Sequence, residues 1–172
     1  MKRHSFAASL ALAVLAVLGL AGPVAAGEQV PFKGGLAGLD ITTAVKLPFV
    51  SVKVTATGNA TQLGKFTFIE LAMVNTATGT GTGTFLFTAA NGGTVFGTIS
   101  GKARLTAPNV LTIVENAMIT GGTGRFAGAS GSFTATRLKN LVTGETTASF
   151  EGTISSPGEG DDNDDDDIGD DD

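Results

Sequence analysis

The sequence predicts an all-β protein, a single antiparallel up-and-down β-barrel of about eight strands. From Phe49 onward, short stretches of β-type residues alternate with turn signals at intervals of roughly ten to fifteen residues. No amphipathic helical window of any length occurs after Phe49. The strands follow one another as hairpins, and closing them into a barrel removes edges that Val- and Thr-rich strands would otherwise expose. These observations favour a barrel over a sandwich.

The N-terminal residues 1–26 are predicted to be a secretory signal peptide. Lys2 and Arg3 are followed by an apolar run from Phe6 to about Leu20 and by small residues ending at Ala26. The alternative is a membrane anchor, but the run is shorter than a spanning helix needs and Gly22-Pro23 follows it. We therefore expect cleavage after Ala26, a secreted or periplasmic protein, and no stable membrane insertion afterwards.

The composition excludes most familiar active-site chemistry. Cys, Trp and Tyr are absent, and the single histidine, His4, lies in the predicted signal. The mature protein therefore has no disulfide, no thiolate, no imidazole base and no His/Cys metal site, and we expect no cofactor. Residues 27–157 carry nine Lys/Arg against six Asp/Glu, whereas the whole mature chain has a net charge of −7. With no Tyr or Trp for base stacking, nucleic-acid binding is not expected.

The predicted barrel domain comprises residues 27–157. Its first strand is short, Gln29 to Lys33, and the weakly patterned stretch up to Leu47 is expected to be a loop or a single helical turn. Asn91-Gly92-Gly93 predicts a tight hairpin, because Asn and Gly tolerate a positive φ, and Thr143-Gly144-Glu145 joins the last two strands. The other predicted strands are Phe49–Thr57, Lys65–Val74, Thr80–Ala90, Thr94–Leu105, Val110–Thr120, Gly131–Lys139 and Thr147–Ser155.

The stretch Lys65–Val74 is apolar on both faces. Phe66 and Phe68 alternate with Ile69 and Leu71. This pattern is typical of a strand that is covered on both sides or that faces a filled interior.

The segment Gly121–Gly131, GGTGRFAGASG, is the most distinctive in the chain. Gly122 to Ala127 superficially fits a dinucleotide-binding fingerprint, but the next predicted element is a strand where that motif requires a helix. We interpret the segment as a tight connection between neighbouring strands, with Phe126 plugging one end of the core. Its signature residues are Gly121, Gly122, Gly124, Arg125, Phe126, Gly128 and Gly131.

Four stretches carry a resemblance to known proteins: GNATQLGKFTF (58–68), AANGGTVFGTISG (89–101), GGTGRFAGASGSFT (121–134) and ASFEGTIS (148–155). Together they resemble a group of small exported bacterial proteins, whose glycine-rich signature resembles the allene oxide cyclase and dirigent barrels. The resemblance implies an eight-stranded, calycin-like antiparallel barrel with a central cavity. Proteins of the exported group commonly have His where this chain has Gln62. No catalytic residue of the plant enzymes has a counterpart here.

Glu115 is the charged residue whose position is hardest to place at the surface. It shares strand parity with Ile113 and Ala117, so a carboxylate is expected on an apolar, inward face. A buried carboxylate needs a partner or a raised pKa. Arg104, Arg125 and Arg137 are the candidate partners.

The sequence alone is compatible with several roles for Glu115. It could form a structural ion pair, anchor a ligand, or turn to solvent at a one-residue bulge. Glu70 poses the same question, and an acid/base pair of the glycosidase kind is not favoured, because no distance between the two acids follows from sequence. The candidate ligand-binding residues are therefore Glu115, Arg137, Arg104 and Glu70.

Residues 158–172, GEGDDNDDDDIGDDD, form an acidic tail that is expected to be disordered. The spacing of its acids imitates a calcium loop, but Asp166 stands where such a loop requires Gly. We expect no specific metal site, only weak divalent-cation binding at Asp161, Asn163 and Asp165.

Three functions are compatible with these features. The first is a noncatalytic exported barrel that binds a small apolar ligand in its interior or mouth. The second is a structural or surface-associated β domain without a ligand. The third, an isomerase or cyclase of the allene oxide cyclase type, ranks below both, because acid/base work would fall to Glu, Lys, Arg or Ser alone. The oligomeric state does not follow from the sequence.

Overall fold

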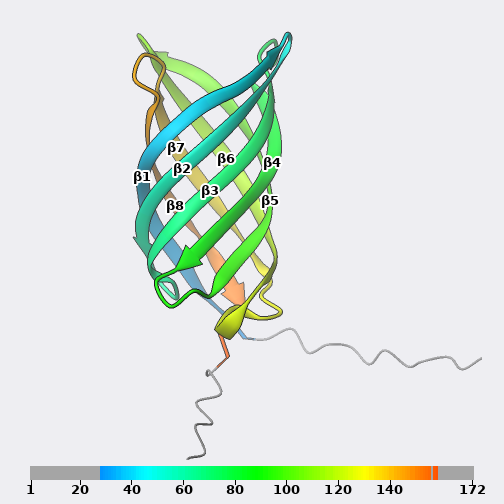
Figure 1. The fold of residues 1–172 in the computed structure, drawn as a ribbon, viewed down its shortest axis with the longest axis vertical. Coiled ribbons are helices and arrows are strands. Elements are labelled where there is room, and N and C mark those ends of the chain that lie inside the picture. Colours follow the sequence, from blue (N-terminus) through cyan, green and yellow to red (C-terminus); the bar gives the residue numbers. More distant parts are fainter. Residues whose placement is uncertain (1–27, 156, 159–172) are drawn as a thin grey trace, which may run out of the picture.

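The computed structural model describes residues 28–155, 157 and 158. Eight antiparallel strands in sequential order form a closed barrel, which confirms the predicted fold class (Figure 1). The predicted signal peptide and residues 159–172, including Asp161, Asn163 and Asp165, lie outside the described residues. The strands are β1 (Gln29–Lys46), β2 (Phe49–Ala60), β3 (Gly64–Asn75), β4 (Thr80–Ala89), β5 (Thr94–Ala107), β6 (Val110–Gly122), β7 (Gly131–Asn140) and β8 (Glu145–Ser155), with a short 3-10 helix η1 (Gly124–Phe126) between β6 and β7.

The barrel closes where β1 pairs with β8 as well as with β2. The two predicted tight turns lie between paired strands. Gly92 connects β4 to β5 with a φ of 84°, and Gly144 connects β7 to β8 with a φ of 76°. Both connections therefore use the left-handed conformation that favours glycine.

The prediction for the first strand is wrong. The structure has one 18-residue strand, β1, where the sequence pattern indicated a short strand followed by a loop or helical turn. Gly34 and Gly38, which resemble loop residues in the sequence, lie inside β1 against β2. A Cβ on Gly38 would lie 2.0 Å from the carbonyl oxygen of Thr55. These glycines permit close approach of two strand backbones rather than a turn.

The two ends of the barrel differ. The connections β1–β2, β3–β4, β5–β6 and β7–β8 surround one end, which we call the mouth, while β2–β3, β4–β5, η1 and the N-terminal end of β1 lie at the other, the closed end (Figure 1). Phe126 of η1 is buried at the closed end, in agreement with its predicted role as a plug. Seven further phenylalanines fill the interior with ring centroids 4.8–6.2 Å apart: Phe32, Phe66, Phe68, Phe85, Phe87, Phe133 and Phe150.

The structure of β3 explains why the stretch Lys65–Val74 is apolar on both faces. Phe66 and Phe68 point into the filled interior, whereas Ile69 and Leu71 are exposed on the outside of the barrel. The inner face therefore agrees with the prediction of a filled interior, and no described residue covers the outer face. No helix among residues 28–155, 157 and 158 is long and apolar enough to cross a bilayer.

Candidate functional site

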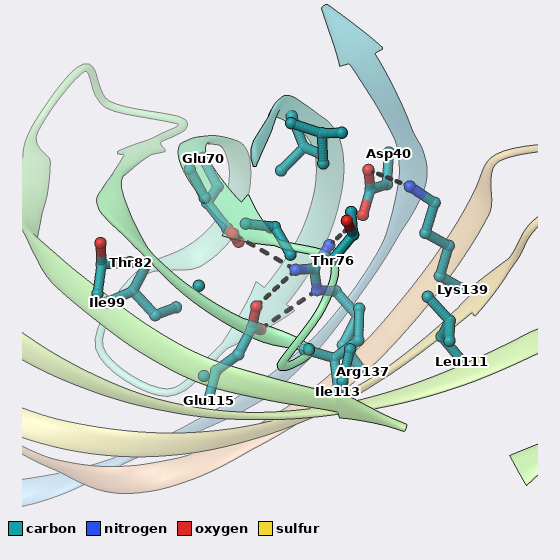
Figure 2. Close-up of a pocket in the computed structure, with 18 of the residues that line it drawn as sticks. Asp40, Glu70, Thr76, Thr82, Ile99, Leu111, Ile113, Glu115, Arg137 and Lys139 are labelled. Carbon is teal, nitrogen blue, oxygen red and sulfur yellow. Dashed lines mark hydrogen bonds and ion pairs between the residues drawn. The ribbon is translucent and has the colours of Figure 1, made fainter. Parts of the chain in front are cut away.

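The mouth opens into a cavity of about 270 Å³ (Figure 2). Its walls are largely aliphatic, because inward positions of the strands near the mouth carry Val, Ile, Leu and Ala. Its floor is polar and contains Asp40, Glu70, Glu115 and Arg137. Apolar wall residues include Val50, Val52, Val74, Ile99, Leu111 and Ile113.

Arg137 of β7 is the centre of the polar floor. Its Nε donates to Glu115 Oε2 at 3.2 Å, and its Nη2 donates to Glu115 Oε1 at 2.5 Å. Nη1 donates to Asp40 Oδ2 at 2.7 Å, and Nη2 also lies 3.3 Å from Glu70 Oε1. One guanidinium therefore contacts three carboxylates, all buried (Figure 2).

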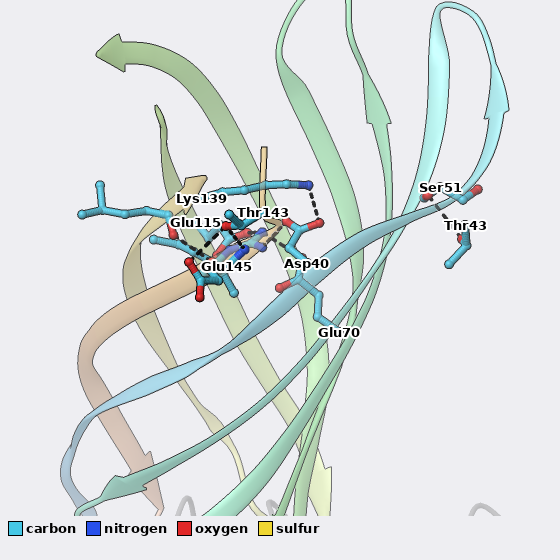
Figure 3. A network of polar contacts seen from close by, with 11 residues as sticks. Asp40, Thr43, Ser51, Glu70, Glu115, Lys139, Thr143 and Glu145 are labelled. Atoms are coloured by element: carbon cyan, nitrogen blue, oxygen red, sulfur yellow. Dashed lines mark hydrogen bonds and ion pairs between the residues drawn. The ribbon is translucent and has the colours of Figure 1, made fainter. Parts of the chain in front are cut away.

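Lys139 extends this network toward the mouth. Its Nζ donates to Asp40 Oδ1 at 2.6 Å, so Asp40 bridges two cations (Figure 3). Lys139 is more exposed than Arg137, with 12% of its side chain accessible against 5%. The solvent accessibility of the floor therefore increases from Arg137 toward Lys139.

Strand register explains why these residues meet. Asp40 of β1 and Glu70 of β3 both pair with Val54 of β2, so the two acids lie at one level of the interior. On the other side, Arg137 pairs with Ile113, two positions from Glu115 on the same face of β6. Because alternate residues of a strand share a face, this register brings all four charges to one layer.

Gly101 provides room for Glu115. It pairs with Glu115 across β5 and β6, and a Cβ on Gly101 would lie 2.7 Å from Glu115 Cγ. An absent side chain on β5 therefore accommodates the longer side chain on β6.

The pKa values of the floor follow from burial and charge. Desolvation raises the pKa of Glu70 to about 7, because the attraction of Arg137 is smaller than the burial effect, and Glu115 and Asp40 add repulsion. For Arg137, burial disfavours the charged form, but the carboxylates of Glu70, Glu115 and Asp40 together raise its pKa above the usual value. The guanidinium remains protonated, and Glu70 is the group poised to be neutral.

Glu70 also has an incompletely bonded carboxyl group. Its Oε1 contacts Arg137, whereas its buried Oε2 has no hydrogen-bond partner among the described residues. Glu70 lines the mouth cavity and also a void of about 10 Å³ beneath the floor. A protonated Oε2 can donate a hydrogen bond, and this is the chemistry that an unpaired buried carboxyl group favours.

The candidate residues from the sequence divide into two groups. Glu115, Glu70 and Arg137 come together on the floor, with Arg137 as the partner of Glu115. The expectation that Arg104 belongs to this site is wrong, because its position on β5 places it on the exposed outer surface. Arg125 is also remote, since at the closed end its Nη2 donates to the carbonyl oxygen of Gln62 and its guanidinium lies 4.9 Å from the Phe126 ring centroid.

The signature segment and Gln62 lie at the closed end. Gly124 and Gly128 have positive φ values in the connection around η1, which agrees with the predicted tight turn. Gln62 donates from Nε2 to the carbonyl oxygen of Pro31 at 3.4 Å. Neither Gln62 nor the connection lines the mouth cavity.

The sequence interpretation missed Asp40 and Lys139. Asp40 lies in the stretch that was expected to be a loop, but it shares parity with Phe32 and Leu36 once β1 is extended. Lys139 shares parity with Arg137 and Phe133, a signal that was present in the predicted strand. In the part of the chain that the structure describes, no group of three or more His, Cys, Asp or Glu side chains is arranged to hold a metal ion.

The barrel is similar to two solved structures. The pterocarpan synthase dirigent protein GePTS1 matches with a TM-score of 0.55 and 16% identity over 77% of this chain and 87% of that chain. The pterocarpan synthase dirigent protein PsPTS1 matches with a TM-score of 0.47 and 17% identity over 77% and 97%. No protein-family model matches the sequence, and no curated protein sequence matches it. The likeness to GePTS1 shows a shared dirigent-like barrel fold, and fold alone does not assign a function.

Proposed function

We propose that this protein is a noncatalytic barrel that binds a small, mainly apolar molecule in its mouth cavity. The observation that carries the proposal is the combination of mainly aliphatic walls with a charged floor. Ligand cavities commonly bury an apolar body and orient it through a few polar groups. The structural similarity to a dirigent protein is compatible with this role through the fold.

The floor suggests which ligands fit. Arg137 is already occupied by three carboxylates, so it has little capacity to bind an anionic group. Glu70 Oε2 is buried without a hydrogen-bond partner among the described residues, and in the neutral acid it would donate to a carbonyl or hydroxyl oxygen that reached the floor. A neutral molecule with one hydroxyl or carbonyl group therefore fits better than a carboxylate or phosphate.

The binding proposal is tested with N-phenyl-1-naphthylamine, a neutral apolar dye that fluoresces when removed from water. We expect saturable binding of one dye per barrel. Ala72→Phe places a ring in the cavity and should reduce affinity at least tenfold, because Ala72 is part of the lining. Leu71→Phe is the matched control, since Leu71 is the exposed neighbour on the same strand.

A structural domain without a ligand makes the opposite prediction. In that case the dye would not bind, or Ala72→Phe and Leu71→Phe would bind it equally. Native mass spectrometry of protein purified from its own host then shows whether a small molecule accompanies the barrel.

We also propose that the protein is exported and processed after Ala26, on the basis of the N-terminal sequence alone. N-terminal sequencing of exported protein should begin at Gly27. Mature protein that retains Met1 would contradict this proposal.

A further inference from the structure

Exposed apolar side chains concentrate at the mouth. Leu47 in the β1–β2 connection is 75% exposed, Val142 in the β7–β8 connection is 74% exposed, and Leu105 at the end of β5 is 65% exposed. The connections at the closed end, residues 61–63, 90–93 and 123–130, contain no exposed large apolar side chain. An apolar grouping confined to the loops of one end is typical of an interaction surface.

Cations surround the same end. Lys46, Lys102 and Arg104 are exposed on the outside of the barrel near the mouth, and Lys53 is half-buried there. None of the four forms an ion pair within residues 28–155, 157 and 158. Glu145 is the one acid among the described residues on the outer surface of this half. The outer surface of the mouth is therefore both apolar and positively charged.

The opposite end has a different charge environment. Glu28 and Glu151 lie in the closed half, together with the cations Lys33, Lys65 and Arg125. The last strand also ends there, at Ser155, from which the sequence continues into ten acidic residues at positions 159–172. The excess of cations over acids on the outer surface is therefore larger at the mouth, and the acidic segment of the sequence follows the strand end at the opposite end.

We propose that the mouth collar docks on an anionic lipid surface. The collar is defined here as Lys46, Leu47, Lys102, Arg104, Leu105 and Val142. Apolar side chains at loop tips enter the interfacial region of a bilayer, and nearby Lys and Arg are attracted to anionic headgroups. The attachment is peripheral and reversible.

A second copy of the chain is a poorer occupant of the collar. Two collars that faced one another would bring together like charges from Lys46, Lys102 and Arg104, with only Glu145 from each copy to offset them. An anionic surface neutralises these cations while the apolar tips leave water. Charge complementarity therefore selects lipid over self-association.

This inference extends beyond the proposed ligand binding and does not depend on it. Docking through the collar would turn the opening of the cavity toward the lipid, so an apolar molecule could pass between bilayer and barrel without crossing water. Vesicle binding is measured on protein without added ligand. Failure of docking would therefore leave the cavity proposal intact, and the reverse also holds.

The experiment is vesicle flotation of the full mature chain, residues 159–172 included. We expect binding to vesicles of phosphatidylcholine with phosphatidylglycerol, and at least tenfold weaker binding to phosphatidylcholine alone. Binding should weaken as salt is added, because salt screens the collar charges. The double variant Lys102→Glu/Arg104→Glu should lose about 25-fold or more in affinity, since each cation near the lipid surface contributes about a fivefold effect and two are removed.

Matched variants separate the collar from general charge and hydrophobicity. Lys33→Glu/Lys65→Glu makes the same charge change at the closed end and should bind vesicles nearly as the wild type does. Leu47→Gln/Val142→Gln should weaken binding, whereas Met118→Gln, an exposed position in the closed half, should not. Because all these side chains are exposed or at loop tips, equal melting temperatures are expected and serve as the folding check.

Three results would overturn the proposal. The first is absence of binding to anionic vesicles. The second is equal loss of binding in the collar and closed-end variants. The third is self-association through the collar. Analytical ultracentrifugation would then give an oligomer mass for the wild type and a lower mass for Leu47→Gln/Val142→Gln.

Discussion

Arg137 determines whether the floor of the cavity is stable. It is buried and bonds Asp40, Glu70 and Glu115, and Lys139 shares Asp40. Removing water from so many charges is costly, and the cost is offset only while the partners remain together. The residue that contacts all three acids should therefore matter more than any single acid.

We predict that Arg137→Met lowers the free energy of unfolding by about 3–5 kcal/mol, because it leaves buried carboxylates without their cation. Glu115→Gln should cost less, since Asp40 and Glu70 still contact the guanidinium. Urea denaturation measures both values. Arg104→Met on the exposed surface is the control and should leave stability nearly unchanged. Equal losses of stability in Arg137→Met and Glu115→Gln would argue against the idea that Arg137 holds all three carboxylates together.

The second prediction concerns pH and Glu70. Its pKa is about 7 in the folded protein against an ordinary value of 4.5, so the folded state holds this proton more tightly than the unfolded state does. Stability from this group is present below about pH 4.5 and is lost as pH rises toward 7. The effect is on the order of 3 kcal/mol at most.

The melting temperature of the wild type should therefore fall between about pH 5 and pH 8 more than that of Glu70→Gln. The amide of the variant is neutral throughout this interval, so the group no longer titrates. Comparing the two proteins isolates the contribution of Glu70 to the pH dependence. Parallel pH profiles would show that Glu70 is ionised in the folded protein across the interval.

Among the elements, β1 shows where a sequence pattern misleads. Most strands could be predicted because alternation and turn residues are local signals, as at Gly92 and Gly144. In β1 the inward positions alternate Phe32, Gly34, Leu36, Gly38 and Asp40, so two of five lack a side chain and one is charged. The sequence of β1 therefore lacks the apolar alternation that is typical of a strand, although the strand is continuous.

The glycines of β1 give a third prediction. Gly38→Ala should destabilise the barrel by about 1–3 kcal/mol, because its Cβ would meet Thr55 O at 2.0 Å and Ala56 Cα at 2.5 Å, both backbone atoms. Gly35→Ala is the matched control on the same strand, with Ala148 O at 3.3 Å as its nearest neighbour. Thermal unfolding of the two variants compares them directly. A loss for Gly35→Ala as large as that for Gly38→Ala would mean that close packing of β1 on β2 is not the cause.

For the whole molecule, register decides which parts of the site could be predicted. Strand parity placed Glu115 inside, but three arginines remained as candidate partners because parity gives no information about distant strands. Asp40 and Arg137 are 97 residues apart and meet only because the barrel closes. The fold follows from local signals, whereas the composition of the floor depends on pairing between strands far apart in sequence.

The last prediction follows from the unequal filling of the two halves. The closed half is packed with phenylalanine rings, whereas the mouth half surrounds a cavity of about 270 Å³. Local opening costs least where few packed contacts are lost. Backbone amides in residues 42–52 and 99–113 should therefore exchange with deuterium faster than those in residues 62–68 and 126–135.

N-phenyl-1-naphthylamine should slow exchange in the mouth half alone, because a ligand stabilises the region that it contacts. Hydrogen-exchange mass spectrometry measures both effects. Equal protection in the two halves would show that the barrel opens as one cooperative unit and that the cavity does not weaken the mouth.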